Sequence, residues 1–98
     1  SGPYKYDMNI YNEGGANLEV NIQLVTQAPE GVFNLENADF TIVKPGSSGD
    51  MFGKDFSVIF NPPYEAGNFE ASVEINSNDT ENSKFVVDIK VKVKVVVV

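Results

Sequence analysis

Strict alternation of apolar and polar residues near the C-terminus is the feature that most constrains the fold. Apolar side chains occupy every second position of one face, at Phe85, Val87, Ile89, Val91, Val93 and Val95. Charged side chains fall on the opposite face, at Asp88, Lys90, Lys92 and Lys94. Because successive side chains of a β-strand point to opposite faces, this spacing predicts a strand with one buried and one solvated face.

The same period of two recurs along most of the chain. The alternating apolar positions are Tyr4, Tyr6, Met8 and Ile10; Leu18, Val20, Ile22 and Leu24; Phe56, Val58 and Phe60; and Phe69, Ala71, Val73 and Ile75. Shorter strands are predicted at residues 32–35 and 39–43, and no stretch has a sustained helical period. Each alternating segment is expected to bury its apolar face, as antiparallel sheets commonly do.

Turn-forming residues separate these segments. The connections read "EGGAN", "QAPEG", "KPGSSGD", "PPYEAG" and "SNDTENS", and each is rich in residues that turns select. Six or seven short strands in 98 residues predict an all-β, immunoglobulin-like β-sandwich of about seven antiparallel strands. The core Cys and Trp of antibody domains are missing. We expect a single domain over residues 4–95, a tag remnant at 1–3 and a terminal tail at 96–98.

The segment "FNPPYEAGNFEASVEINSND", residues 60–79, is crowded with special residues. We interpret its start as a turn, because Pro62 cannot donate to a strand ladder and Gly67 permits a conformation that bulkier residues resist. A hairpin closed by residues 77–83 would place Glu70 opposite Lys90. An opposite-charge pair at such a position contributes about 0.2–1 kcal/mol.

Composition argues against several classes of function. The 14 acidic residues outnumber 7 cations, all of them Lys, for a net charge of −7, whereas nucleic-acid binding needs a basic surface. Without His or Cys, the chain lacks a Ser-His-Asp triad, a thiol nucleophile and Cys/His zinc ligands. We therefore expect no enzyme activity and no cofactor. No apolar run approaches the roughly 18 residues of a membrane span, so no membrane insertion is expected.

Oxygen donors in "NSNDTEN", residues 76–82, raise the alternative of a calcium site. The weak metal candidates are Asn78, Asp79 and Glu81, beside Asn76. Their order lacks the pattern of a known calcium loop, and Asn and Asp also bond to their own backbone in turns. Both interpretations remain open from the sequence.

Two sets of residues are candidates for contact with a partner. Tyr11, Ile59 and Tyr64 are expected outside the core, where they bind a partner or pack on loops. The last predicted strand is the second set. At the edge of a sheet its backbone could pair with another chain, and Lys90, Lys92 and Lys94 would guard it against unwanted pairing. The final "VVVV" is either an unguarded sticky edge or the approach to a further repeat.

The order of these motifs resembles the ASH domain family, the immunoglobulin-like domains of abnormal-spindle and hydin proteins, with bacterial relatives called choice-of-anchor D domains. The resemblance spans about residues 6–95. The positions that carry it are Asn12, Gly14, Leu18, Pro45, Gly46, Phe56, Val58, Phe60, Pro62, Gly67, Phe69, Ser77, Asn78 and Asp79. Family members often have a glycine in the last strand, which this chain lacks.

The resemblance implies a fold similar to major sperm protein and pilus-chaperone domains, with structural turn residues at Asn12, Gly14, Pro45, Gly46, Pro62 and Gly67. It also implies a non-catalytic structural or protein-interaction module within a larger multidomain protein. The expected partners are proteins or neighbouring domains, and the isolated domain is expected to be a monomer. The alternative is a calcium- or carbohydrate-binding accessory domain of a surface protein. Composition favours a bacterial cell surface or extracellular location, with a cilium or centrosome as the alternative.

Overall fold

Seven β-strands make up the computed structural model, which describes residues 2–46, 52–63 and 65–94. They are β1 (Tyr4–Asn12), β2 (Leu18–Ala28), β3 (Phe33–Glu36), β4 (Asp39–Ile42), β5 (Phe52–Phe60), β6 (Gly67–Ser77) and β7 (Lys84–Val93). The described ranges contain no helix long and apolar enough to cross a membrane. The seven strands confirm the predicted all-β fold.

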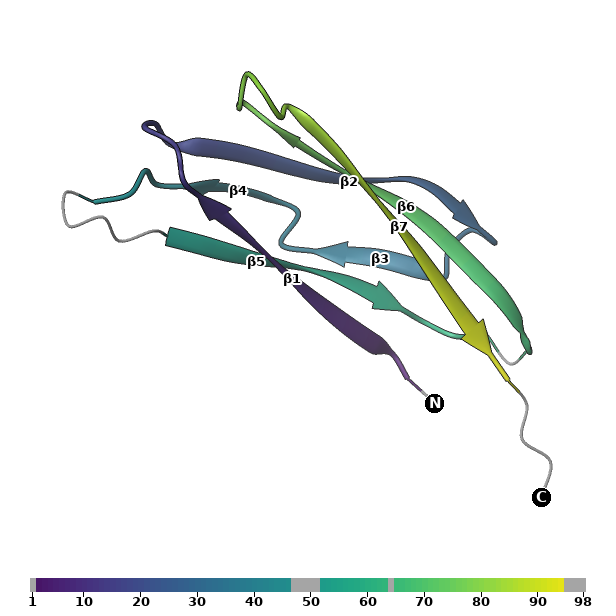
Figure 1. The fold of residues 1–98 in the computed structure, drawn as a ribbon. Coiled ribbons are helices and arrows are strands. Elements are labelled where there is room, and N and C mark those ends of the chain that lie inside the picture. The colour runs from purple at the N-terminus through teal and green to yellow at the C-terminus, as the bar shows by residue number, and fades with distance from the viewer. Residues whose placement is uncertain (1, 47–51, 64, 95–98) are drawn as a thin grey trace.

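The strands form two antiparallel sheets that pack into a sandwich (Figure 1). The three-stranded sheet has the order β1-β5-β3, and the four-stranded sheet has the order β4-β2-β6-β7. The predicted immunoglobulin-like sandwich is confirmed. The strand β5 starts at Phe52, earlier than the predicted residue 56, because its non-alternating first residues still pair with the end of β1, where Asn12 lies opposite Phe52.

The core lies between β5 and the central strands of the four-stranded sheet. Its buried apolar side chains are Val20, Ile22, Val32, Phe33, Ile42, Phe56, Val58, Phe60, Phe69, Ala71 and Val73. At one end of this core the Phe60 ring lies 5.1 Å from Phe33 and 5.4 Å from Phe69, measured between ring centroids. The predicted inward positions of β5, and those of β6 from Phe69 to Val73, are therefore confirmed.

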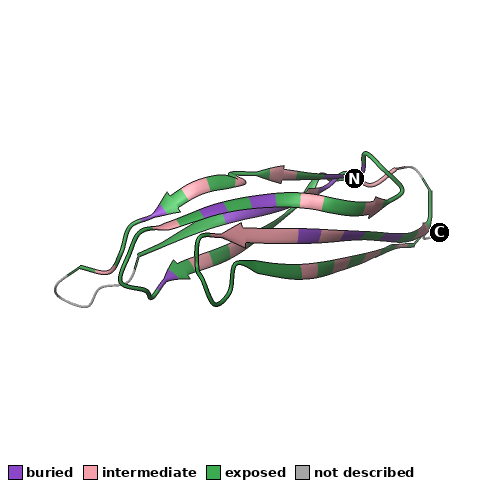
Figure 2. Ribbon diagram, turned by 90° about the horizontal axis from the view of Figure 1, so that it is seen from above, coloured by how far each residue is buried: buried purple, intermediate pink, exposed green. Residues whose placement is uncertain are grey.

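None of the buried apolar side chains of the core comes from β1 or β7. Figure 2 colours the buried residues purple. Tyr4 is 49% exposed, Tyr6 is 54% exposed and Phe85 is 63% exposed. The expectation of a continuous buried face is wrong for these three side chains. Each of the two strands lies at the edge of its sheet, so no neighbouring strand covers its outer flank.

The chain passes from one sheet to the other between β3 and β4. These strands belong to different sheets, and only Asn37 and Ala38 connect them. Asn37 adopts a left-handed conformation with φ of 56°, and the carbonyl oxygen of Ala38 accepts a hydrogen bond of 2.7 Å from the N–H of Ile22. Asn tolerates this conformation better than other non-glycine residues, which explains its place at the crossing.

We therefore predict that Asn37→Ala lowers the free energy of unfolding by about 1 kcal/mol, because Ala pays the full steric cost of a left-handed backbone. Asn37→Gly should stay within about 0.5 kcal/mol of the parent, since glycine adopts this conformation freely. Urea unfolding of the three proteins measures both values. Equal destabilisation by Ala and Gly would contradict the assignment of the effect to backbone conformation.

Candidate functional site

The strand β7 is an edge strand of the four-stranded sheet. Within the described residues its ladder partner is β6, and its opposite flank pairs with no strand. The register places Glu70 opposite Lys90, as predicted from the length of the connecting loop. From the sequence, β7 was a binding candidate on the condition that it lies at the edge of a sheet. Its position in the strand order meets this condition.

The outward face of β7 carries exposed lysines. Lys90, Lys92 and Lys94 are all exposed. Lys92 lies opposite Asn68, so it has no charged residue across the ladder. The salt bridges found in the described part of the chain involve other lysines, one of which, Lys84, is the first residue of β7. They join Lys5 Nζ to Glu36 Oε2 at 3.2 Å and Lys84 Nζ to Glu74 Oε1 at 3.8 Å.

The inward faces of β1 and β7 border what we call the open side, the space between these two edge strands. Their side chains are half-buried or exposed: Tyr4, Tyr6, Met8 and Ile10 on β1, and Phe85, Val87, Ile89, Val91 and Val93 on β7. Several of them, including Met8, Ile89 and Val91, pack against the core. The open side is therefore apolar and only partly covered.

One end of the open side is a cleft of about 640 Å³. Tyr4 and Tyr6 line it from β1, and Val91 and Val93 line it from β7. Lys92 and Lys94 also border it, together with Pro62 and Pro63 of the turn after β5. The side chains of the two edge strands thus leave a hollow between them at this end.

The turn after β5 shapes this cleft. The N–H of Asn61 donates to the carbonyl oxygen of Val32 at 2.7 Å, and the half-buried Pro62 follows. Tyr64 lies outside the described residues. Gly67 is the first residue of β6, opposite Val93, and its φ of 159° is close to extended backbone. Gly67 therefore lies at the junction between the turn and β6, and its role as a turn residue stays a prediction.

The turn after β1 is organised by the side chain of Asn12. This residue is buried, and its Nδ2 donates to the carbonyl oxygens of Ala16 at 2.8 Å and Ile42 at 3.0 Å. Its Oδ1 accepts a 2.9 Å hydrogen bond from the N–H of Gly14. Since Ile42 belongs to the other sheet, Asn12 both closes the turn and ties the two sheets together.

We predict that Asn12→Ala lowers the free energy of unfolding by about 1–3 kcal/mol, because it leaves the buried carbonyl oxygen of Ile42 and the part-buried N–H of Gly14 without their side-chain partner. The matched control is Asn34→Ala, which truncates an exposed asparagine on β3 and should change stability by less than about 0.5 kcal/mol. Thermal and urea unfolding measure both. Similar losses for the two variants would show that the buried hydrogen bonds contribute little.

The loop between β6 and β7 is joined to the start of β2 by Asn78. Its Oδ1 accepts from the N–H of Glu19 at 2.9 Å, and its Nδ2 donates to the carbonyl oxygen of Asn17 at 3.1 Å. Its backbone N–H donates to the carbonyl oxygen of Glu19 at 3.3 Å. Asn78 therefore continues the ladder beyond the end of β6 with both its backbone N–H and its side-chain amide.

Asp79 forms a local turn in the same loop. Its Oδ1 accepts hydrogen bonds from the backbone N–H groups of Glu81, at 2.9 Å, and Asn82, at 3.3 Å. In the ranges that the structure describes, no three His, Cys, Asp or Glu side chains are grouped to hold a metal ion. The oxygens of Asn78 and Asp79 proposed as calcium donors thus have backbone partners, as in the alternative interpretation of this loop as a turn.

We predict that millimolar calcium leaves the melting temperature unchanged, because a bound ion would have to displace the backbone partners of Asn78 and Asp79. Scanning calorimetry in calcium and in chelator measures this, with magnesium at equal ionic strength as the control. A rise specific to calcium that Asp79→Asn abolishes would establish a calcium site in this loop.

The structure also places the remaining turn and surface residues that the sequence singled out. Pro45 and Gly46 follow β4, next to Lys44, whose N–H donates to Asn17 Oδ1 at 3.1 Å. Tyr11 is exposed and lies over Gly53, its partner across the ladder, where an added Cβ would come within 2.8 Å of the ring. Ile59 is half-buried between Lys5 and Asn34 on the outer face of the three-stranded sheet.

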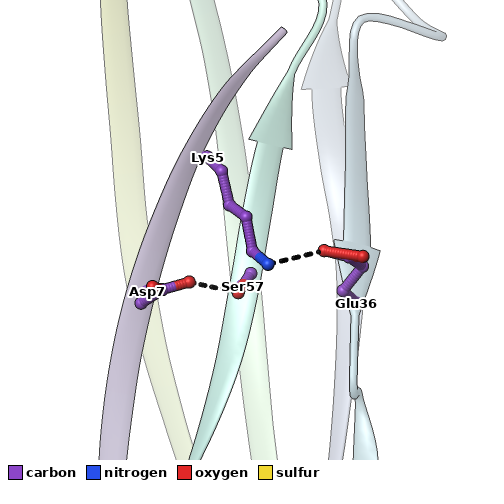
Figure 3. A network of polar contacts seen from close by, with 4 residues as sticks. All are labelled: Lys5, Asp7, Glu36 and Ser57. Atoms are coloured by element: carbon purple, nitrogen blue, oxygen red, sulfur yellow. Dashed lines mark hydrogen bonds and ion pairs between the residues drawn. The ribbon is translucent and has the colours of Figure 1, made fainter.

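Figure 3 shows a network of polar contacts on that outer face. The sequence alone does not indicate this network. The Lys5–Glu36 salt bridge joins β1 to β3 across β5, the strand between them. Beside it, the buried Ser57 Oγ donates to Asp7 Oδ1 at 2.5 Å. The alternation predicts that such side chains are solvated, but only the strand order shows which of them meet. This face is crossed by polar contacts, in contrast to the open side.

Comparison with known proteins supports the same fold. No family model and no curated protein matches the chain. One similar solved structure is SSP-19, an MSP-domain protein like family member from Caenorhabditis elegans, with 12% identity, a TM-score of 0.52 and coverage of 95% of this chain and 88% of that one. Another is the ASH / PapD-like domain of human CEP192 (PapD-like domain 7), with 11% identity, a TM-score of 0.58 and coverage of 93% and 70%. The chain thus has an immunoglobulin-like fold of the MSP and ASH/PapD-like type, as the sequence resemblance predicted.

Proposed function

We propose that this chain is a non-catalytic structural and protein-interaction module, one domain of a larger multidomain protein. The observation that carries the proposal is the free edge of β7, whose inward side chains border the open side. Edge strands bind proteins by adding a strand to the sheet, and a half-covered apolar surface favours contact with another protein. The partner is a separate protein or a neighbouring domain of the same chain.

Three further observations support this function over catalysis or ligand binding. The sequence contains no His and no Cys, so the usual nucleophile and base combinations are lacking. The resemblance to ASH domains, which serve as scaffolds and protein-binding modules, points to the same function. The calcium-binding alternative has no comparable support, because Asn78 and Asp79 bond to backbone groups.

The two similar structures also bear on location. They come from a nematode and from human, and the human neighbour fits the cilium or centrosome that the resemblance allowed. They give no support to the bacterial surface that composition favoured. We therefore propose the ciliary or centrosomal location, which imaging of the tagged full-length protein in its own cells tests. Staining of the outer surface of unpermeabilised cells would contradict it.

Hydrogen exchange tests the interaction function. We expect backbone amides of β7 (Lys84–Val93) to exchange more slowly in the purified full-length protein with its bound partners than in the isolated domain, because the edge becomes hydrogen-bonded. The amides of β5, which pair on both sides, are the internal control and should not change. Slower amide exchange at another surface would place the binding site there instead of on β7. Identical exchange throughout the chain would contradict an interaction function.

A further inference from the structure

We propose that β7 binds an extended peptide whose side chains alternate between apolar and acidic, and that this peptide adds as a further strand over the open side. The inference rests on the proposed function as an interaction module and specifies the chemistry of the partner. It combines the free backbone edge of β7, the apolar cleft between β1 and β7, and a row of exposed lysines at the end of β7.

The free edge is long enough to hold a peptide in register. The strand β7 has 10 residues, whereas the edge strands β3 and β4 on the other flank of the sandwich have 4 each. The strand β1, with 9 residues, is also an edge, but it carries a single lysine, Lys5, which already pairs with Glu36. The β7 edge is therefore the better site for strand addition.

The open side sets the inward half of the peptide pattern. A strand beside β7 projects every second side chain toward the space between β1 and β7. There these side chains would meet the half-exposed rings of Tyr4 and Tyr6 and the cleft beside Val91. Apolar side chains at these positions would be removed from water together with those rings, which favours binding.

The lysines set the outward half of the pattern. Outward side chains of an added strand lie beside Lys90, Lys92 and Lys94, and opposite charges at neighbouring cross-strand positions attract. On its other side Lys92 faces the neutral Asn68, so its charge is not neutralised across the existing ladder. Acidic residues at the outward positions complement this row.

The same lysines disfavour a second copy of the chain as the occupant. Antiparallel pairing centred on Lys92 would bring Lys90 of one copy opposite Lys94 of the other, and like charges directly opposite destabilise a ladder. Natural edge strands commonly carry lysines that prevent such self-pairing. The lysines therefore disfavour pairing of β7 with another copy of itself and favour pairing with an acidic strand.

The probe for this proposal is a short, capped peptide of alternating Glu and Val, titrated into the 98-residue chain and followed by NMR. We expect chemical-shift changes on β7 and at the Tyr4 and Tyr6 rings, and weaker binding as salt increases. A peptide of alternating Lys and Val, and a scrambled Glu/Val peptide with its Val residues clustered, are the controls. Equal binding of the three peptides, or shifts confined to another surface, would overturn the proposal.

A charge-reversal pair sharpens the test. Lys92→Glu should weaken binding of the Glu/Val peptide by about tenfold, corresponding to about 1.4 kcal/mol. Lys44→Glu is the matched control, because Lys44 is also exposed but follows β4 at the other edge of the sheet. Both variants change the net charge equally, so long-range repulsion of the peptide is the same. Equal affinity of the two variants would overturn the proposal, provided that their spectra show a folded chain.

Two outcomes separate this proposal from the broader function. Concentration-dependent dimerisation through β7, measured by ultracentrifugation, would show that a second copy of the chain occupies this edge. It would overturn the proposal of an acidic partner strand. If the peptide does not bind but β7 is still protected from exchange in the full-length protein, the proposal of an acidic partner strand is overturned, while the interaction function stands. No peptide binding and no protection anywhere would overturn both.

Discussion

Packing of Phe60 against Phe33 and Phe69 is the contact on which the candidate site depends. Phe33 is its neighbour in the same sheet, and Phe69 belongs to the facing sheet, so this one ring holds two strands and two layers at a fixed distance. Directly after Phe60 the backbone bonds to Val32, and the prolines that line the cleft follow. Packing in the core thereby fixes the position of the cleft, although few residues of the cleft belong to the core.

The opposite end of the sandwich is closed by amide side chains. Asn12 bonds to the backbone of the turn after β1 and to Ile42 at the end of β4, while Asn78 bonds to backbone groups at the start of β2. Both asparagines belong to the pattern by which the sequence resembles ASH domains. Their hydrogen bonds give a physical reason why such a pattern specifies a fold and leaves the choice of partner to the edges.

Much of this architecture could be predicted from the sequence, for reasons visible in particular residues. Alternation identified the inward faces of β2, β5 and β6, and a short polar loop placed Glu70 opposite Lys90 because it leaves few registers for the hairpin. Exposure of Tyr4 and Tyr6 could not be predicted, since alternation shows which side chains share a face but not whether another strand covers them. The same limit hid the Lys5–Glu36 bridge, which depends on the order of three strands.

The cleft has a geometric consequence for a protein built from several such domains. It is lined by both the beginning of β1, at Tyr4, and the end of β7, at Val93. Chain segments joined to these two strands would therefore depart from the same end of the sandwich. In such a protein both connections would leave the domain at the end that carries the cleft, with the turn after β1, at Asn12, at the opposite end of the sandwich.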